Sequence, residues 1–156
     1  MIQLFTELQE KKNVRSNLSA LRASLKEATE EQKAQAIEFV RGHEDLVFGF
    51  LQEEDAKTRK NAALLLGDLA VQNALQPLWK AYTREQTLFV KSAYLEAMKA
   101  LHAEEILSQL KDRLAELEGE PVTEENRKHW EAELRALRAI LLQYEGIDTH
   151  HFDIKQ

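Results

Sequence analysis

The sequence predicts an all-α fold of about eight helices, arranged as stacked helical hairpins. Three observations support this prediction. The chain of 156 residues contains only 5 Gly and 2 Pro, which leaves few places for turns. Apolar residues recur at spacings of three and four along most of its length, as they do on one face of a helix. A pattern of two helices also repeats with a period of roughly 30 to 32 residues, which is typical of helical repeat proteins.

The first helices are predicted by apolar stripes and by one capping signal. Residues 14–28 carry apolar side chains at spacings of four and three, namely Val14, Leu18, Leu21, Leu25 and Ala28. Thr29 followed by Gln32 has the form of a capping box, in which each side chain bonds the backbone amide of the other residue. We therefore expect a helix over 30–42, followed by a short helix over 43–52.

The central helices begin at residues that favour N-caps. Asp55 is a candidate N-cap for a helix that runs to about Ala70. Asn73 is a candidate N-cap for the next helix, and Pro77 falls in the first turn of that helix, where a missing amide hydrogen costs little.

The sequence after residue 87 predicts three more helices, followed by a loss of the helical period. We expect helices over 88–101, 104–118 and 124–144, the last of which ends at Gly146. Residues 147–156 lose the helical period and alternate as a strand does, so we expect an extended tail that begins a further domain.

Self-similarity favours a stack of hairpins over a simple bundle. A shift of 32 residues aligns positions of like character in two consecutive helix pairs. The aligned pairs are Thr58-Arg59 with Val90-Lys91, Leu65 with Ala97, Leu66 with Met98, Leu69 with Leu101, Ala74 with Ile106, Leu75 with Leu107, Leu78 with Leu110 and Tyr82 with Leu114. Such a period of two helices indicates a solenoid.

The stretch EEDAKTRKNAALLLGDLAVQNALQPLWKAY resembles a short HEAT repeat. It has an Asp, then a Thr-Arg pair, paired alanines, Leu-Gly and, after a turn, Ala-Leu-x-x-Leu. The resemblance covers residues 55–82 best, then 87–114, then 30–52. It implies a right-handed α-α superhelix over residues 1–146, in which 1–28 and 124–144 are capping helices.

The resemblance also implies contacts between repeats. Asp55 and Arg59 match the acidic and basic residues that form a ladder of hydrogen bonds between neighbouring HEAT repeats. In the second repeat Thr87 replaces the Asp and Lys91 replaces the Arg, and Glu85 lies close enough in sequence to substitute for the missing acid.

Small residues on the same helix predict a close helix–helix contact. Ala63, Gly67 and Ala70 are spaced four and three apart, so they share one face. Glycine costs a helix up to about 1 kcal/mol relative to alanine, and a close approach by a neighbouring helix would explain its presence.

A binding surface is implied by the repeat register, because the second helix of each HEAT hairpin lines the concave face. The candidate residues are Lys57, Lys60, Asn61, Leu64 and Asp68 on one helix, and Phe89, Ser92, Glu96 and Ala100 on the next. Lys57 and Lys60 would attract an anion, or would simply be solvated. Leu64 and Phe89 would form an apolar contact for a partner, or would be wedged against the next helix.

Composition and motifs argue against several other classes of function. The net charge of -6 disfavours nucleic acid, and the absence of Cys excludes a thiolate nucleophile or a zinc-thiolate site. His150 and His151 with Asp153 are a weak candidate for a metal site, because adjacent residues of an extended chain point to opposite sides. We find no catalytic motif, so we expect no catalytic residue, cofactor or bound metal.

The expected function is therefore non-catalytic binding or scaffolding of a protein or peptide, or of a C-terminal domain of the same polypeptide. No signal peptide or membrane span is evident, so we expect a cytoplasmic protein. The alternative is an accessory domain of an RNA-modifying enzyme, since the arrangement is weakly similar to helical extensions that precede some bacterial RNA methyltransferase domains. A HEAT-like DNA glycosylase is a third interpretation, which the negative charge disfavours.

Overall fold

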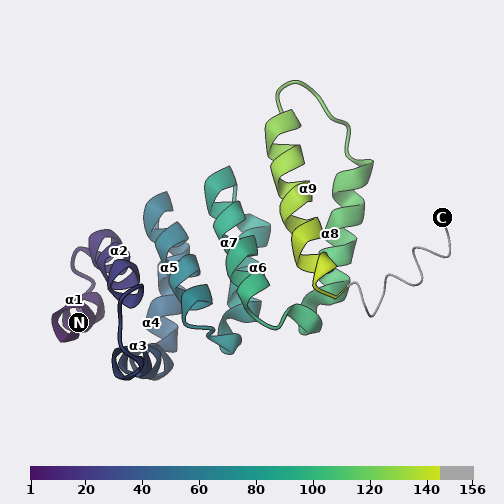
Figure 1. Ribbon diagram of the computed structural model, residues 1–156. Coiled ribbons are helices and arrows are strands. Elements are labelled where there is room, and N and C mark those ends of the chain that lie inside the picture. Colours follow the sequence, from purple (N-terminus) through teal and green to yellow (C-terminus); the bar gives the residue numbers. More distant parts are fainter. Residues whose placement is uncertain (145–156) are drawn as a thin grey trace. The chain divides into compact units, whose positions relative to one another are not determined.

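A computed structural model describes residues 1–144 of the chain, and every secondary-structure element in that range is a helix (Figure 1). The predicted all-α class is confirmed for this part of the chain. The expected helix end at Gly146, the strand-like tail over 147–156 and the histidine pair at 150–151 lie outside the described residues.

The chain divides into two compact units, Met1–Leu101 and His102–Gln156. Unit 1 contains α1 (Ile2–Gln9), α2 (Val14–Leu25), α3 (Glu30–Gly42), α4 (Glu44–Gly49), η1 (Phe50–Gln52), α5 (Ala56–Asp68), η2 (Gln72–Ala74), α6 (Leu75–Arg84) and α7 (Leu88–Ala100). The described part of unit 2 contains η3 (Ala103–Ile106), α8 (Leu107–Gly119) and α9 (Arg127–Leu142). The boundary between the units falls inside the range 87–114 that we expected to form one repeat.

Two of the predicted helix starts are confirmed. Thr29 accepts a hydrogen bond from the Gln32 amide at 3.1 Å and the Gln32 side chain accepts one from the Thr29 amide at 3.0 Å, so the capping box opens α3. Asp55 accepts a hydrogen bond from the Thr58 amide at 2.9 Å and is the N-cap of α5. Both side chains satisfy an amide that the helix itself leaves free.

The predicted N-cap role of Asn73 is wrong. Asn73 lies in η2, and its side-chain amide donates to the Glu44 carboxylate at 3.1 Å. A carboxylate distant in sequence therefore binds the side chain that local propensity assigned to the helix start, and α6 begins without a side-chain cap.

The predicted start of the last helix, near residue 124, is also wrong, because α9 begins at Arg127. The Thr123 amide donates to the Asn126 side-chain oxygen at 2.7 Å, and the Asn126 amide donates to the Thr123 hydroxyl at 3.3 Å. These reciprocal bonds have the same form as those between Thr29 and Gln32, and residues 124–126 form a turn that leads into α9.

Three helices of unit 1 lie side by side: α5 packs against α2 on one side and against α7 on the other (Figure 1). Gly67 makes the α5–α7 contact close, because a Cβ atom on this residue would lie 2.9 Å from the Ala97 Cα. Ala63 is also buried. The predicted close approach is therefore confirmed at Gly67.

Ala70 does not belong to this packing face, contrary to the prediction. It is exposed and has a φ of 52°, in the left-handed region. Its amide donates to the Gly67 carbonyl, and the Val71 amide donates to the Leu66 carbonyl, both at 3.0 Å. This pair of bonds is the Schellman motif that closes a helix, so Ala70 ends α5 at a position where glycine is usual.

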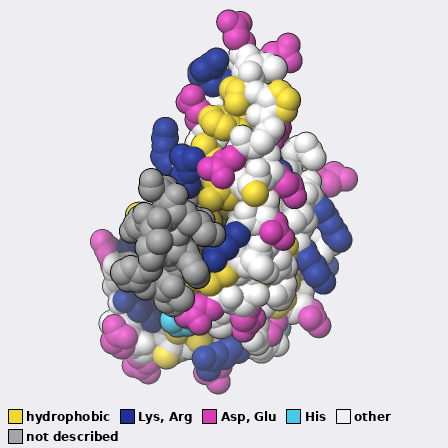
Figure 2. All heavy atoms as spheres, turned by 90° about the vertical axis from the view of Figure 1, so that its right-hand side faces the viewer, with side chains coloured by type: hydrophobic (Ala, Val, Ile, Leu, Met, Phe, Trp, Pro, Cys, Tyr) yellow, Lys and Arg dark blue, Asp and Glu magenta, His cyan; other side chains and the backbone are white. Residues whose placement is uncertain are grey.

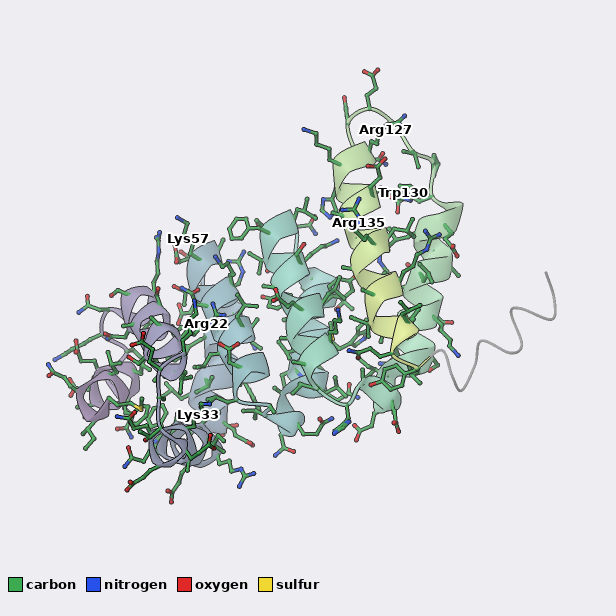
Figure 3. The ribbon with its side chains drawn as sticks, viewed as in Figure 1. Arg22, Lys33, Lys57, Arg127, Trp130 and Arg135 are labelled. Carbon is green, nitrogen blue, oxygen red and sulfur yellow. The ribbon has the colours of Figure 1, made fainter. Side chains whose placement is uncertain are left out.

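In unit 2, α8 and α9 form a hairpin around Leu110, Leu117, Leu134, Leu137 and Ile140, all of which are buried. The Trp130 indole, which lies between the two helices, donates to the Leu117 carbonyl at 2.6 Å (Figure 3). Figure 2 shows acidic, basic and apolar side chains interspersed on one face of the molecule. Among residues 1–144 no helix combines the length and the hydropathy that crossing a bilayer requires.

Candidate binding surface

The candidate residues on α5 and α7 occupy the outward stripe of each helix. Their neighbours in sequence, such as Thr58, Ala62 and Val90, are buried. Lys57, Asp68, Phe89, Glu96 and Ala100 are exposed, and Lys60, Asn61, Leu64 and Ser92 are half-buried. Phe89 has 46% of its surface exposed, which is unusual for an aromatic side chain inside a folded unit.

A groove of about 590 Å³ brings three of these candidates together with residues of α2. It is lined by Asn13, Val14, Arg15, Ser16, Ser19, Lys57, Lys60 and Asn61. The other candidates, including Leu64 and Phe89, do not line it. The groove therefore depends on α2, a helix that the sequence predicted to be only a cap.

Two acidic side chains, the N-cap of α5 and the last residue of α5, are each bound by an arginine of α2. Asp55 accepts from Arg15 at 3.4 Å, and Asp68 accepts from Arg22 at 2.8 Å. Figure 3 shows Arg22 at the edge of α2 that faces α5, and Lys57 projecting from the first turn of α5. Within residues 1–144, neither Lys57 nor Lys60 forms an ion pair shorter than 4.0 Å, so these two positive charges are not neutralised at contact distance.

Asp55 remains ionised under ordinary conditions because its N-cap contacts stabilise the charged form. Hydrogen bonds from the Thr58 hydroxyl, at 2.8 Å, and from the Thr58 amide lower the pKa of Asp55, and the charges of Arg15 and Lys57 lower it further. Asp55 thus caps α5 and also orients Arg15 of the neighbouring helix.

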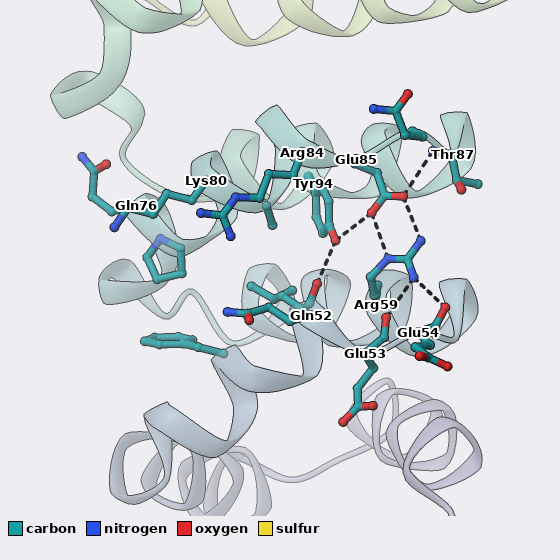
Figure 4. Close-up of a pocket in the computed structure, with 15 residues that line it drawn as sticks. Gln52, Glu53, Glu54, Arg59, Gln76, Lys80, Arg84, Glu85, Thr87 and Tyr94 are labelled. Carbon is teal, nitrogen blue, oxygen red and sulfur yellow. Dashed lines mark hydrogen bonds and ion pairs between the residues drawn. The ribbon is translucent and has the colours of Figure 1, made fainter.

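Arg59 and Glu85 form a buried ion pair between α5 and the segment before α7 (Figure 4). Two guanidinium nitrogens, Nε and Nη2, each lie 2.9 Å from a different carboxylate oxygen of Glu85. Arg59 also donates to the carbonyls of Glu53 and Glu54 at 2.8 Å. A bidentate pair of this kind fixes both side chains in one geometry.

Glu85 is further bound by two neutral donors. The Tyr94 hydroxyl donates to Glu85 at 3.1 Å, and the Thr87 amide donates to it at 3.2 Å. Burial alone would raise the pKa of Glu85, but the hydrogen bonds from Arg59 and Thr87 and the charge of Arg59 outweigh burial and lower it. Burial and the adjacent carboxylate raise the pKa of Tyr94, so its hydroxyl keeps its proton and acts as a donor.

Lys91 lies elsewhere on α7. Its ammonium group is 5.8 Å from the centroid of the Tyr82 ring on α6, a distance that suits a cation–π interaction. Lys57, Lys60 and Lys91 therefore do not gather at one place, since the first two line the α2–α5 groove and Lys91 contacts α6.

The sequence prediction missed Arg15, Arg22 and Ser19, which lie on the polar side of α2 at spacings of four and three. That spacing was visible in the sequence, but it does not show which helix lies beside α5. Among residues 1–144 no group of three or more His, Asp or Glu side chains is placed to hold a metal ion.

The groove combines cationic side chains from two helices, and its serine and asparagine side chains add hydrogen-bond donors and acceptors. Comparisons of the chain with protein-family models, with curated proteins and with solved structures found no match.

Proposed function

We propose that the chain is a non-catalytic binding module of HEAT-like helical repeats, stacked as a right-handed superhelix, whose α2–α5–α7 face holds a segment of a partner protein. The side-by-side packing of α2, α5 and α7 supports the repeat arrangement. The close contact at Gly67 supports it as well, since neighbouring repeats pack through such small residues.

The observation that carries the proposal is the groove that contains Lys57 and Lys60. No carboxylate lines it, although the chain as a whole has a net charge of -6. A local positive patch on an acidic protein attracts a short acidic segment more effectively than a long polyanion, which the rest of the surface repels. Leu64 on α5 and Phe89 on α7 add apolar area outside the groove, so the expected partner is an acidic peptide segment that also carries apolar side chains.

The test measures binding of a short fluorescein-labelled peptide rich in Glu and Leu by fluorescence anisotropy. A counterpart with Lys in place of every Glu should not bind. The pair of substitutions Lys57→Glu and Lys60→Glu should weaken binding at least about tenfold, because like charges then meet at the groove. The substitutions Leu64→Asp and Phe89→Asp should weaken it without changing the helical content seen by circular dichroism.

Lys80→Glu with Arg84→Glu is the matched control, since both residues lie on α6 and neither lines the groove. This pair makes the same change of charge and should leave the affinity unchanged. Equal affinity of the acidic peptide for the Lys57→Glu, Lys60→Glu protein would contradict the proposal.

A role as an accessory RNA-binding domain is the second candidate, because the three basic residues that line the groove, Arg15, Lys57 and Lys60, could contact phosphates. In that case a single-stranded RNA oligonucleotide should bind more tightly than the peptide. Its affinity should fall with salt at a slope of about 0.7 per phosphate contact, so roughly 2 for Arg15, Lys57 and Lys60. Absence of RNA binding at low salt would exclude this candidate.

A further inference from the structure

Unit 1 has a larger cleft, of about 740 Å³, that shares no residue with the α2–α5 groove (Figure 4). One wall belongs to α6 and carries Gln76, Pro77, Lys80, Ala81 and Arg84. The opposite wall is formed by Phe48 and residues 51–54, and one end is closed by Arg59, Glu85 and Tyr94. Its volume lies within the range of about 300 to 1,000 Å³ that is common for small-molecule sites.

The closed end of the cleft is fixed by hydrogen bonds. Tyr94 is buried, and its hydroxyl lies within hydrogen-bond distance of both the Leu51 carbonyl, at 3.3 Å, and the Glu85 carboxylate. Arg59 and Glu85 bind each other in bidentate fashion. The charges at this end are therefore already matched, so the end shapes the cleft and does not attract a ligand charge.

The charges that remain available come from α6. Lys80 and Arg84 are one helical turn apart, on the same face of α6, and both are exposed. Among residues 1–144, neither forms an ion pair shorter than 4.0 Å. Figure 4 shows both side chains extending along the cleft wall. Together they offer a planar guanidinium and an ammonium group to one anion.

The rest of the lining decides the kind of anion. Phe48, Leu51, Pro77 and Ala81 supply apolar surface beside the two cations. Glu53 and Glu54 line the end of the cleft beside Arg59, which binds their backbone carbonyls. Two cations match a single carboxylate, whereas a ligand with several negative charges, such as a nucleic acid or a polyphosphate, would be repelled by a chain whose net charge is -6.

We propose that this cleft is a binding site for a monocarboxylate with an apolar body. Arg84 and Lys80 bind the carboxylate, and the apolar body lies against Phe48 and Pro77. Two sources share this chemistry, a free organic acid and the C-terminal carboxylate of a peptide that ends in an apolar residue. The site is independent of the α2–α5 groove, so each proposal can fail without the other.

The test is an amide ¹H–¹⁵N NMR titration of the full chain with phenylpropionate. We expect saturable shifts confined to residues of the cleft, with a Kd in the millimolar range. The neutral isostere phenylpropionamide should bind at least about tenfold more weakly, because it lacks the charge. An acetylated dipeptide that ends in phenylalanine identifies the source: tighter binding than phenylpropionate indicates a peptide terminus, and weaker binding indicates a free acid.

Two variants separate this site from non-specific binding. Lys80→Gln with Arg84→Gln should weaken phenylpropionate binding at least about tenfold. The matched variant Lys57→Gln with Lys60→Gln removes the same charge from the other groove and should leave the affinity unchanged. The spectra of the free variants show whether each is folded. Absence of saturable shifts, equal binding of acid and amide, or unchanged binding after Lys80→Gln with Arg84→Gln overturns the proposal.

Discussion

Each unit of the chain holds a buried glutamate against an arginine of a neighbouring segment, but the two pairs have different surroundings. In unit 1, Arg59 binds Glu85, whose side chain is 5% exposed, through contacts of 2.9 Å. In unit 2, Arg113 of α8 binds Glu133 of α9, whose side chain is 2% exposed, at 3.0 and 3.2 Å. The two pairs thus share a bidentate geometry.

The additional partners differ in charge. Arg59 and Glu85 are bound by backbone groups and by the Tyr94 hydroxyl, which are neutral. Arg113 also binds Glu116 at 3.1 Å, and His129 lies 3.7 Å from Glu133. The unit 1 pair is therefore stabilised by groups that cannot replace a lost charge, whereas a histidine in unit 2 can supply a second cation when it is protonated.

The largest expected effect is the loss of Arg59. Arg59→Met keeps much of the side-chain length but leaves Glu85 buried without a cation, which should cost unit 1 about 3–5 kcal/mol in free energy of unfolding. Arg113→Met should cost unit 2 less, roughly 1–3 kcal/mol, because Arg113 is more exposed and His129 remains near Glu133.

Urea unfolding followed by tryptophan fluorescence can measure both losses separately. Trp79 reports on unit 1 and Trp130 on unit 2, each in a protein whose other tryptophan is replaced by phenylalanine. Equal losses for the two arginine variants would show that the neutral surroundings of Glu85 do not distinguish the pairs.

The second effect concerns how closely the helices approach. Gly67→Ala would place a Cβ atom 2.9 Å from the Ala97 Cα, so α5 and α7 must separate, at a cost of about 1–3 kcal/mol. Gly49→Ala is the control, because no atom lies within 4 Å of its added Cβ and the residue lies in α4. It should stabilise unit 1 by about 0.5–1 kcal/mol. If both variants lose stability equally, the close contact at Gly67 does not limit the packing.

The helices were predictable because their signals are local. The apolar period, the Thr29 capping box and the Asp55 N-cap each depend on residues within one or two turns. The prediction failed where a partner distant in sequence competes, as Glu44 does for Asn73, or where side chains close a turn, as at Asn126.

The candidate site was predictable only in part, for the same reason. Helical period identified the outward stripes of α5 and α7. It could not show that α2 lies beside α5, so Arg15 and Arg22 were missed, nor that Tyr94 reaches Glu85. Such contacts depend on which helices become neighbours, and that is decided by packing over the whole unit.

The third effect is a dependence of the stability of unit 1 on pH. The pKa of Glu85 in the folded state lies below its ordinary value. As the pH falls, the unfolded state therefore binds more protons than the folded state does. The stabilisation from Glu85 is fully present above the ordinary pKa of 4.5 and is lost as the pH falls through the folded pKa. Glu85→Gln should therefore be less stable than the parent at neutral pH, and the difference should narrow in acid.

Urea unfolding of the parent and of Glu85→Gln at several pH values, followed through Trp79, measures this difference. Glu7→Gln is the control, since it makes the same substitution on α1, which takes no part in the Arg59–Glu85 ion pair. If the difference in free energy of unfolding between the parent and Glu85→Gln stays constant down to low pH, the proposed stabilisation of the charged form of Glu85 is contradicted.

The smallest effect should raise stability. Ala70 ends α5 with a φ of 52°, a conformation that costs a residue with a Cβ atom about 1–2 kcal/mol. Glycine adopts it freely but loses more entropy on folding, so the net gain of Ala70→Gly in unit 1 should be about 0.5–1 kcal/mol. The same change at Ala115, an exposed residue inside α8, removes a good helix former and should destabilise unit 2 by a similar amount. Opposite signs for these two variants, read by Trp79 and Trp130, would show that the end of α5 is strained while α8 is regular. A loss of stability from Ala70→Gly would mean that the left-handed conformation costs alanine less than the additional entropy that glycine loses on folding.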